Sequence, residues 1–203
     1  MKIVFLPGVG FNEDICKYEK FLSLLKKNID FEFEIVNWKH DYLMDAHENH
    51  HIQYDDFGFK KTKSWFSEVV LDFQHVLLNV SDMDIPEADV YMGHSAGSIL
   101  ALANAKNKHC ILYGSPVKLI DPKIYENGSF INACNCSGTK VLNFIHKNDI
   151  IAYPIEKENV ENYYFKSPFY KCSSFNPISA HRSYWSSSEV QNKTIDKLIE
   201  WRY

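Results

Sequence analysis

The 203-residue chain lacks several features that would assign it to a specialised class of protein. It contains no run of about eighteen apolar residues, so we expect no membrane-spanning helix. Arg182 and Arg202 are its only arginines and its formal net charge is -4, so it has no basic stripe of the kind that binds nucleic acid. Its five cysteines are an odd number and do not suggest a disulfide framework, which favours reduced thiols and a cytoplasmic location.

A recognisable metal-ligand motif is also missing, although histidines and aspartates gather between residues 40 and 59. These residues are His40, Asp41, Asp45, His47, His50, His51, Asp55 and Asp56. Their spacing matches no helical ligand motif such as His-Glu-x-x-His, and Cys134 with Cys136 is too small a set for a zinc site. We therefore expect no metal and no cofactor, and interpret residues 40–60 as a solvated loop or small lid. A metal site there is the alternative.

The composition is ordinary for one globular domain spanning residues 1–203, with 45% hydrophobic and 24% charged residues. Apolar runs of strand length alternate with segments of helical periodicity. This pattern predicts an α/β protein, a three-layer doubly wound fold with helices on both faces of a mostly parallel sheet. The expected strands are Met1–Leu6, Phe31–Ile35, Ala88–Met92, His109–Tyr113 and Val141–His146, with one more inside Tyr163–Phe175.

Four helices are expected between and after these strands. One starts near Asn12 and ends at Asn28, the second covers Trp65–Leu77, and the third follows Gly97. The fourth ends the chain, and Ser186 and Glu189 have the spacing of a capping box at its start. Together with the strands, they complete the alternation that an α/β domain requires.

The most informative motif is Gly93-His94-Ser95-Ala96-Gly97, directly after the apolar run 88–92. The pattern Gly-x-Ser-x-Gly between a strand and a helix describes a nucleophile elbow. The turn is so sharp that the residues two before and two after the serine must be nearly free of side chain, which explains Gly93 and Gly97. Ser95 is therefore the candidate nucleophile, and we interpret His94 as a packing residue beside it.

A serine hydroxyl needs a general base and an orienting acid, and in chains of this type they follow in the order Ser, Asp or Glu, His. The histidines downstream of the motif are His109, His146 and His181. The first two lie inside expected strands, where side chains point sideways into the core or the surface. His181 follows an expected loop over residues 172–180 and precedes the last helix, so it is the expected base.

The acid is expected at the carboxyl edge of the sheet, where open α/β folds build their sites. Asp149 lies in the first turn after the expected strand 141–146 and is the preferred candidate. Asp121, which lies several residues beyond the strand 109–113, is the competing one.

Two backbone N–H groups are needed to bind the oxyanion of an acyl-transfer reaction. The amide of Ala96, directly after the nucleophile, supplies one. The other is expected from the loop Pro7-Gly8-Val9-Gly10-Phe11, because flanking glycines let the amide of Val9 approach a ligand closely. Gly10 is the alternative donor in this loop.

With these residues in this order, the chain resembles small α/β-hydrolases of the serine esterase and lipase type. The resemblance covers nearly the whole chain, from the loop 6–10 through the elbow 93–97 and Asp149 to His181. It implies a minimal α/β-hydrolase fold without the family's first two strands, because the chain starts at the strand before the family's oxyanion loop. It departs from the family at Pro7-Gly8, where a His-Gly pair is common, and this leaves the oxyanion donor open.

The sequence therefore predicts a serine hydrolase that acts on a small-molecule acyl compound, with a carboxylic ester as the favoured substrate class. Ser95, His181 and Asp149 would form the catalytic triad. Thioesters and amides are cleaved by the same machinery and are alternatives. A non-catalytic binding module on the same fold is the alternative from a different class.

Overall fold

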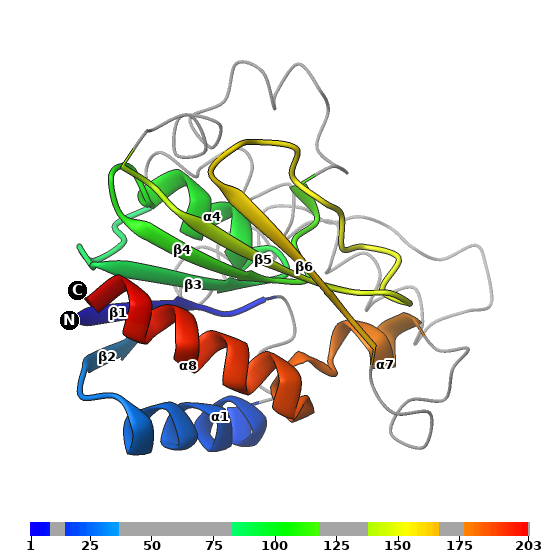
Figure 1. Ribbon diagram of the computed structural model, residues 1–203, viewed down its shortest axis with the longest axis horizontal. Coiled ribbons are helices and arrows are strands. Elements are labelled where there is room, and N and C mark those ends of the chain that lie inside the picture. Colours follow the sequence, from blue (N-terminus) through cyan, green and yellow to red (C-terminus); the bar gives the residue numbers. More distant parts are fainter. Residues whose placement is uncertain (9–14, 37–82, 118–137, 167–176, 203) are drawn as a thin grey trace, which may run out of the picture.

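The computed structural model describes residues 1–8, 15–36, 83–117, 138–166 and 177–202 of the chain. Its strands are β1 (Lys2–Leu6), β2 (Glu32–Ile35), β3 (Val90–His94), β4 (His109–Tyr113), β5 (Val141–His146) and β6 (Val160–Phe165). They form one six-stranded sheet in the order β2-β1-β3-β4-β5-β6, and every described pair of neighbours is parallel (Figure 1). The prediction of an α/β protein with a parallel sheet is confirmed.

Helices cover both faces of this sheet (Figure 1). On one face, α1 (Ile15–Asn28) and α8 (Ser188–Arg202) lie in contact with each other. On the other face lies α4 (Gly97–Asn104). A short helix, α7 (Pro177–His181), and a 3-10 turn, η3 (Tyr184–Ser186), precede α8. The described elements therefore form three layers.

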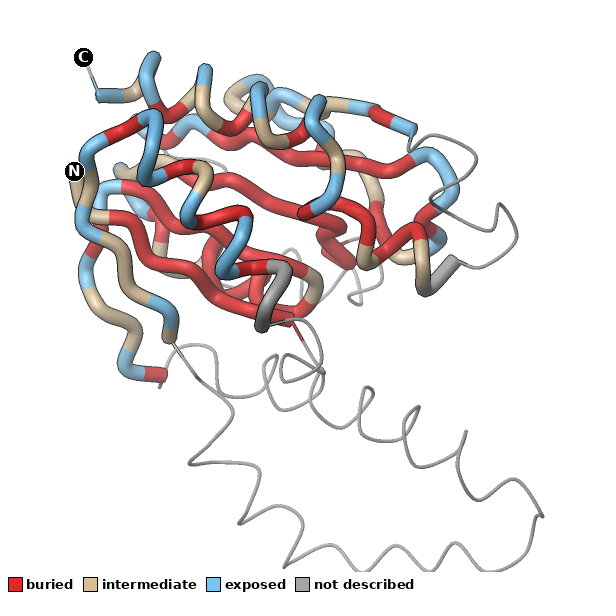
Figure 2. Tube along the Cα trace, turned by 90° about the horizontal axis from the view of Figure 1, so that it is seen from below, coloured by how far each residue is buried: buried red, intermediate tan, exposed pale blue. Residues whose placement is uncertain are grey.

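The strands in the middle of the sheet are buried on both sides because helices cover both faces. In β1, Ile3 and Phe5 face α1 and α8, whereas Val4 and Leu6 face α4. Aromatic side chains dominate the first of these two cores, among them Phe21, Tyr113, Phe144 and Trp185. The buried runs of the central strands are visible in Figure 2. This burial explains why these strands are continuous apolar runs in the sequence.

The two edge strands are less buried than the central ones. The alternation of Glu32 and Glu34 with apolar residues predicts an edge strand, and β2 does lie at an edge. Ile35, expected on its apolar face, is nevertheless 37% exposed, because it ends a strand that has a neighbour on one side only. At the other edge, β6 begins at Val160, earlier than the aromatic stretch in which a strand was expected.

The final helix begins differently from the prediction, and the expected capping box is wrong. The Ser186 hydroxyl donates to the Ser183 carbonyl (3.0 Å) as part of the η3 turn. Instead, the Ser187 hydroxyl accepts the Val190 N–H (3.4 Å), while the Glu189 carboxylate accepts a hydrogen bond from Tyr163. The 3-10 turn has therefore moved the start of the helix by about one residue.

Two expected elements, the helix over Trp65–Leu77 and the loop or lid over 40–60, lie outside the described residues. In the described part of the chain, no helix is both long and apolar enough to cross a membrane.

The order of the strands also locates the point where the topology of the sheet reverses. The chain first proceeds from β1 to β2 and then returns to β3 on the other side of β1, so the direction of winding reverses between β1 and β3. Open α/β sheets bind ligands outside the carboxyl ends of the strands at such a reversal. Leu6 and Gly93 are register partners near these two strand ends, so the residues that follow them lie at this edge of the sheet.

Candidate active site

Ser95 occupies a strained turn between β3 and α4. Its φ angle is +52°, in the left-handed region that a residue with a side chain adopts at a cost of about 1–3 kcal/mol. The strand ends at His94 and the helix starts at Gly97, so the reversal is confined to Ser95 and Ala96. The serine is half-buried and lies at the carboxyl end of β3.

The two glycines of the motif are required by close contacts. A Cβ atom on Gly93 would lie 2.5 Å from the Gly97 carbonyl oxygen, and one on Gly97 would overlap the Leu6 carbonyl group. A Cβ on Gly8 would lie 2.7 Å from the Ser95 Cβ. The segment after β1 therefore passes directly over the turn that carries Ser95.

The carbonyl of Ser95 is held by the first turn of α4. It accepts the Ser98 N–H (3.0 Å) and the Ser98 hydroxyl (2.6 Å). The Ser98 hydroxyl also lies 2.9 Å from that of Ser115. Ala96 stands at the N-terminus of the helix, where backbone N–H groups have no partner within the helix. Its amide is thus available to an anion at this end of α4.

The structure brings Asp149 and His181 together. The Asp149 Oδ2 atom lies 2.8 Å from the Nδ1 atom of His181, which donates the hydrogen bond when Nδ1 carries the proton. Asp149 lies in the turn after β5, where its N–H donates to the His146 carbonyl (2.9 Å). His181 is the last residue of α7, so the expectation of a loop over 172–180 is wrong for residues 177–180, and residues 172–176 lie outside the described residues. Pro177 is the first residue of that helix, a position that suits proline because its missing N–H is not needed there.

The Asp149 carboxylate is buried and fully hydrogen-bonded. In addition to His181, its Oδ2 accepts the hydroxyl of Tyr184 (2.7 Å) and its Oδ1 accepts the N–H of Ile151 (3.0 Å). Burial alone raises the pKa of the Asp149 carboxyl, but the hydrogen bond and charge of His181, with the other two donors, outweigh it and lower the pKa below its usual value. The carboxylate therefore stays ionised next to the imidazole.

Gly114 connects the serine with the Asp149–His181 pair. His94 and Tyr113 are register partners in β3 and β4, so Ser95 and Gly114 follow at the same level of neighbouring strands. Gly114 has a φ of +65°, and a Cβ on it would lie 3.0 Å from Asp149 Oδ2 and from His181 Nδ1. Ser95 and the Asp149–His181 pair thus lie at the same edge of the sheet, at the carboxyl ends of β3, β4 and β5, and no hydrogen bond joins His181 Nε2 to Ser95 in the described structure.

His94 packs beneath His181. The two rings are stacked with their centroids 4.8 Å apart. The His94 Nε2 lies 3.0 Å from the His181 carbonyl oxygen and its Nδ1 lies 3.0 Å from the Tyr18 hydroxyl, so Nε2 donates and Nδ1 accepts. Burial, helped by the nearby His181, lowers the pKa of His94 to about 3. His94 is therefore neutral near pH 7 and has both nitrogens engaged, as expected of a packing residue.

The remaining nitrogen of His181, Nε2, is buried and has no hydrogen-bond partner in the described part of the structure. A buried imidazole nitrogen without a partner is costly, and it is free to accept a proton from a neighbouring group. Since Nδ1 faces Asp149, Nε2 carries the lone pair and is the basic atom of the ring.

Several residues fall outside these observations. Val9, Gly10 and Asp121 lie outside the described residues, as do the histidines between 40 and 51. Within the described ranges, no three potential ligand side chains come close enough together to hold a metal ion.

Tyr184 and Gly114, in contrast, belong to the site but were missed by the sequence reasoning. Gly114 could have been found, because it directly follows the expected strand 109–113 at the catalytic edge, whereas nothing in the sequence marks Tyr184.

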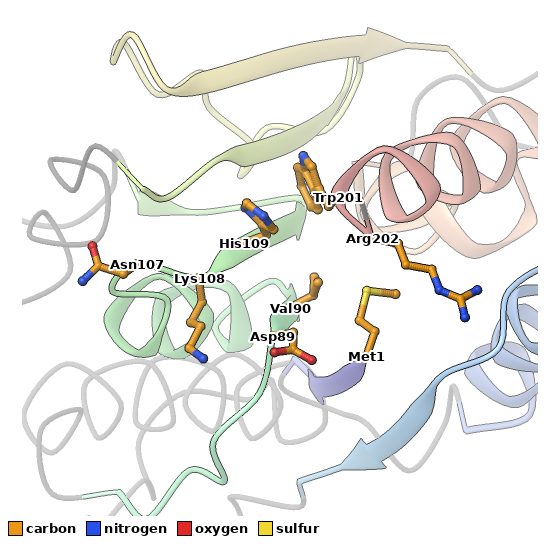
Figure 3. A pocket seen from close by; sticks show the side chains of 8 residues that line it. All are labelled: Met1, Asp89, Val90, Asn107, Lys108, His109, Trp201 and Arg202. Carbon is orange, nitrogen blue, oxygen red and sulfur yellow. The ribbon is translucent and has the colours of Figure 1, made fainter.

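A cavity of about 570 Å³ lies at the opposite end of the strands (Figure 3). Val90 and His109, the first residues of β3 and β4, line it together with Trp201 of α8. The rings of His109 and Trp201 are stacked with centroids 4.7 Å apart. Because Ser95 follows the other end of β3, this cavity is separate from the candidate active site.

No protein-family model and no curated protein matches this sequence. What the structure itself shows is an α/β protein with a parallel sheet that carries a serine, a histidine and an aspartate at its carboxyl edge.

Proposed function

We propose that this protein is a serine hydrolase that cleaves an acyl compound, with a carboxylic ester as the favoured substrate class. The observation that carries the proposal is the Asp149–His181 hydrogen bond (2.8 Å) at the same sheet edge as a serine in a strained strand-to-helix turn. An imidazole oriented by a carboxylate is the group that activates a serine hydroxyl as a nucleophile.

In the proposed mechanism, Ser95 Oγ attacks the carbonyl carbon of the substrate while His181 Nε2 takes its proton. Asp149 holds the ring with Nδ1 protonated and stabilises the imidazolium that forms. The tetrahedral intermediate collapses when His181 gives its proton to the leaving group, which leaves an acyl group on Ser95. A water molecule then attacks this ester, with His181 again acting first as base and then as acid.

The negative charge of the tetrahedral intermediate needs hydrogen-bond donors. The Ala96 amide at the N-terminus of α4 is one donor in this proposal, and the dipole of the helix supports the same charge. The amide of Val9 or Gly10 is the second. This second donor is supported by the position of Gly8, which lies close to Ser95. Val9 and Gly10 follow Gly8 directly in the chain.

These features support membership of the α/β-hydrolase class. The support for this class is the parallel sheet, the turn with Ser95 after β3 and the carboxylate of Asp149 after β5. The mechanism uses no metal or organic cofactor, and we propose that it works in the cytoplasm on a small-molecule substrate.

The proposal is tested with a fluorophosphonate probe and p-nitrophenyl esters of graded chain length. We expect one label per chain at Ser95, and Ser95→Ala should lose both the label and turnover, apart from a residual rate of about a thousandfold over water. Ser186→Ala is the matched control, because its hydroxyl only bonds the Ser183 carbonyl. Labelling of another serine, or full activity in Ser95→Ala, would overturn the proposal and favour a binding module.

A further inference from the structure

One oxygen of Asp149 is shared between two donors. Its Oδ2 atom lies 2.8 Å from His181 Nδ1 and 2.7 Å from the hydroxyl of Tyr184. The Tyr184 oxygen in turn accepts the backbone N–H of His146 at the end of β5 (3.2 Å). Its single proton is therefore directed at Asp149, because the amide occupies the acceptor side of the hydroxyl group.

The ring of Tyr184 has no freedom to turn this hydroxyl elsewhere. It is fully buried and packs edge-on against Phe165, His94 and His181, with ring centroids 5.2, 6.0 and 6.4 Å away. Burial and the charge of Asp149 raise the pKa of Tyr184 well above its usual value. The hydroxyl therefore stays protonated and remains a donor throughout the working pH range.

We infer that Tyr184 is a positioning residue that shares the charge of Asp149 with His181 and so sets the basicity of the base. This inference rests on the proposed function. A carboxylate oxygen that accepts a second strong hydrogen bond concentrates less charge on the imidazole, so it stabilises the imidazolium less. Tyr184 thus draws part of the Asp149 charge away from the imidazolium form of His181.

The other titratable groups around this pair differ in how they act on it. His94, beneath the His181 ring at the end of β3, is neutral, and its partner Tyr18 of α1 lies beyond it. His146 lies at the end of β5, where burial lowers its pKa. Arg182 is next to His181 in the chain. All these groups are the same in the wild type and in a variant that lacks only the Tyr184 hydroxyl, so the effect of Tyr184 can be isolated by substitution.

The first test compares Tyr184→Phe with the wild type in the pH dependence of kcat/KM for a p-nitrophenyl ester. We expect the midpoint of the acid limb to move to higher pH by about 0.5 to 1 unit. Tyr113→Phe is the matched control. Its hydroxyl is equally buried and bonds Thr194 (3.1 Å), and its loss should leave the midpoint in place. A purely structural role for Tyr184 would lower activity in Tyr184→Phe without moving its midpoint.

A second variant gives the opposite sign and keeps the native shape. Site-specific replacement of Tyr184 by 3-fluorotyrosine keeps the hydroxyl but makes it a stronger donor, so the midpoint should move to lower pH. This variant decides the question if Tyr184→Phe does not fold. An unchanged midpoint in the fluorotyrosine protein would contradict the inference.

A measurement that needs no turnover separates this inference from the proposed function. The pH midpoint of the His181 ring proton signals is followed by NMR in the wild type, Tyr184→Phe and Tyr113→Phe. A midpoint that rises only in Tyr184→Phe supports charge sharing, even if fluorophosphonate labelling fails and the hydrolase proposal is rejected. Equal midpoints in all three proteins would refute the role of Tyr184 while leaving the hydrolase proposal intact.

Discussion

Acid should destabilise this protein through a histidine that is not expected to react. His94 is buried between Tyr18 and His181, and its pKa is lowered from 6.5 to about 3 in the folded chain. In the unfolded chain the same ring regains its ordinary pKa. Between these two values the unfolded state binds a proton that the folded state does not, so the free energy of unfolding falls as the pH drops below about 6.5.

The size of the effect follows from the two pKa values. At pH 5 the ring lies about 1.5 units below its unfolded pKa, and each unit corresponds to about 1.4 kcal/mol. His94 should therefore cost the protein about 2 kcal/mol between pH 7 and pH 5. That is a large part of the stability of an ordinary domain, about 5–15 kcal/mol.

The measurement is urea unfolding at pH 7 and pH 5, for the wild type and for His94→Gln. Glutamine can still donate to the His181 carbonyl, so the variant should fold, and its stability should depend less on pH by about 2 kcal/mol. His109→Gln is the control, because burial also lowers the pKa of His109 but its ring is only half-buried. Its contribution should be smaller. The same pH dependence in the wild type and in His94→Gln would refute the reasoning.

Three further predictions concern the site. Asp149→Asn should lower kcat up to about ten-thousandfold, because an amide favours the wrong tautomer of His181, while Asp121→Asn should change kcat by less than about tenfold. Steady-state kinetics on folded variants decides between the two acids. The reverse result would assign the role of the acid to Asp121. Gly114→Ala should lower kcat by about tenfold to a hundredfold, since a Cβ at positive φ would press on Asp149 and His181, whereas Gly138→Ala meets only ordinary contacts and should stay active. Dialysis against EDTA should leave ester hydrolysis unchanged; inactivation that zinc or manganese reverses would instead favour a metal site between residues 40 and 59.

The sequence by itself determined the elements that depend on local patterns. Apolar runs such as His109–Tyr113 predicted strands, and the structure has a strand with these bounds. The spacing of Gly93 and Gly97 predicted the sharp turn, because only a residue without a Cβ fits two positions away from its centre. Asp149 could be selected because it directly follows a strand, and the carboxyl ends of parallel strands share one edge. These inferences need only neighbours in the chain.

Only the tertiary structure decided how the site is supported. Tyr184 reaches Asp149 across 35 positions of the chain, and His94 reaches the His181 carbonyl across 87. No periodicity or motif encodes such pairs, because they depend on how β3, β5, α7 and η3 are placed relative to one another. The start of the last helix was missed for a similar reason, because Ser186 belongs to the η3 turn and its hydroxyl bonds the Ser183 carbonyl. Local sequence patterns thus identified the groups proposed to react, and long-range packing determined their charge, their orientation and their hydrogen-bond partners.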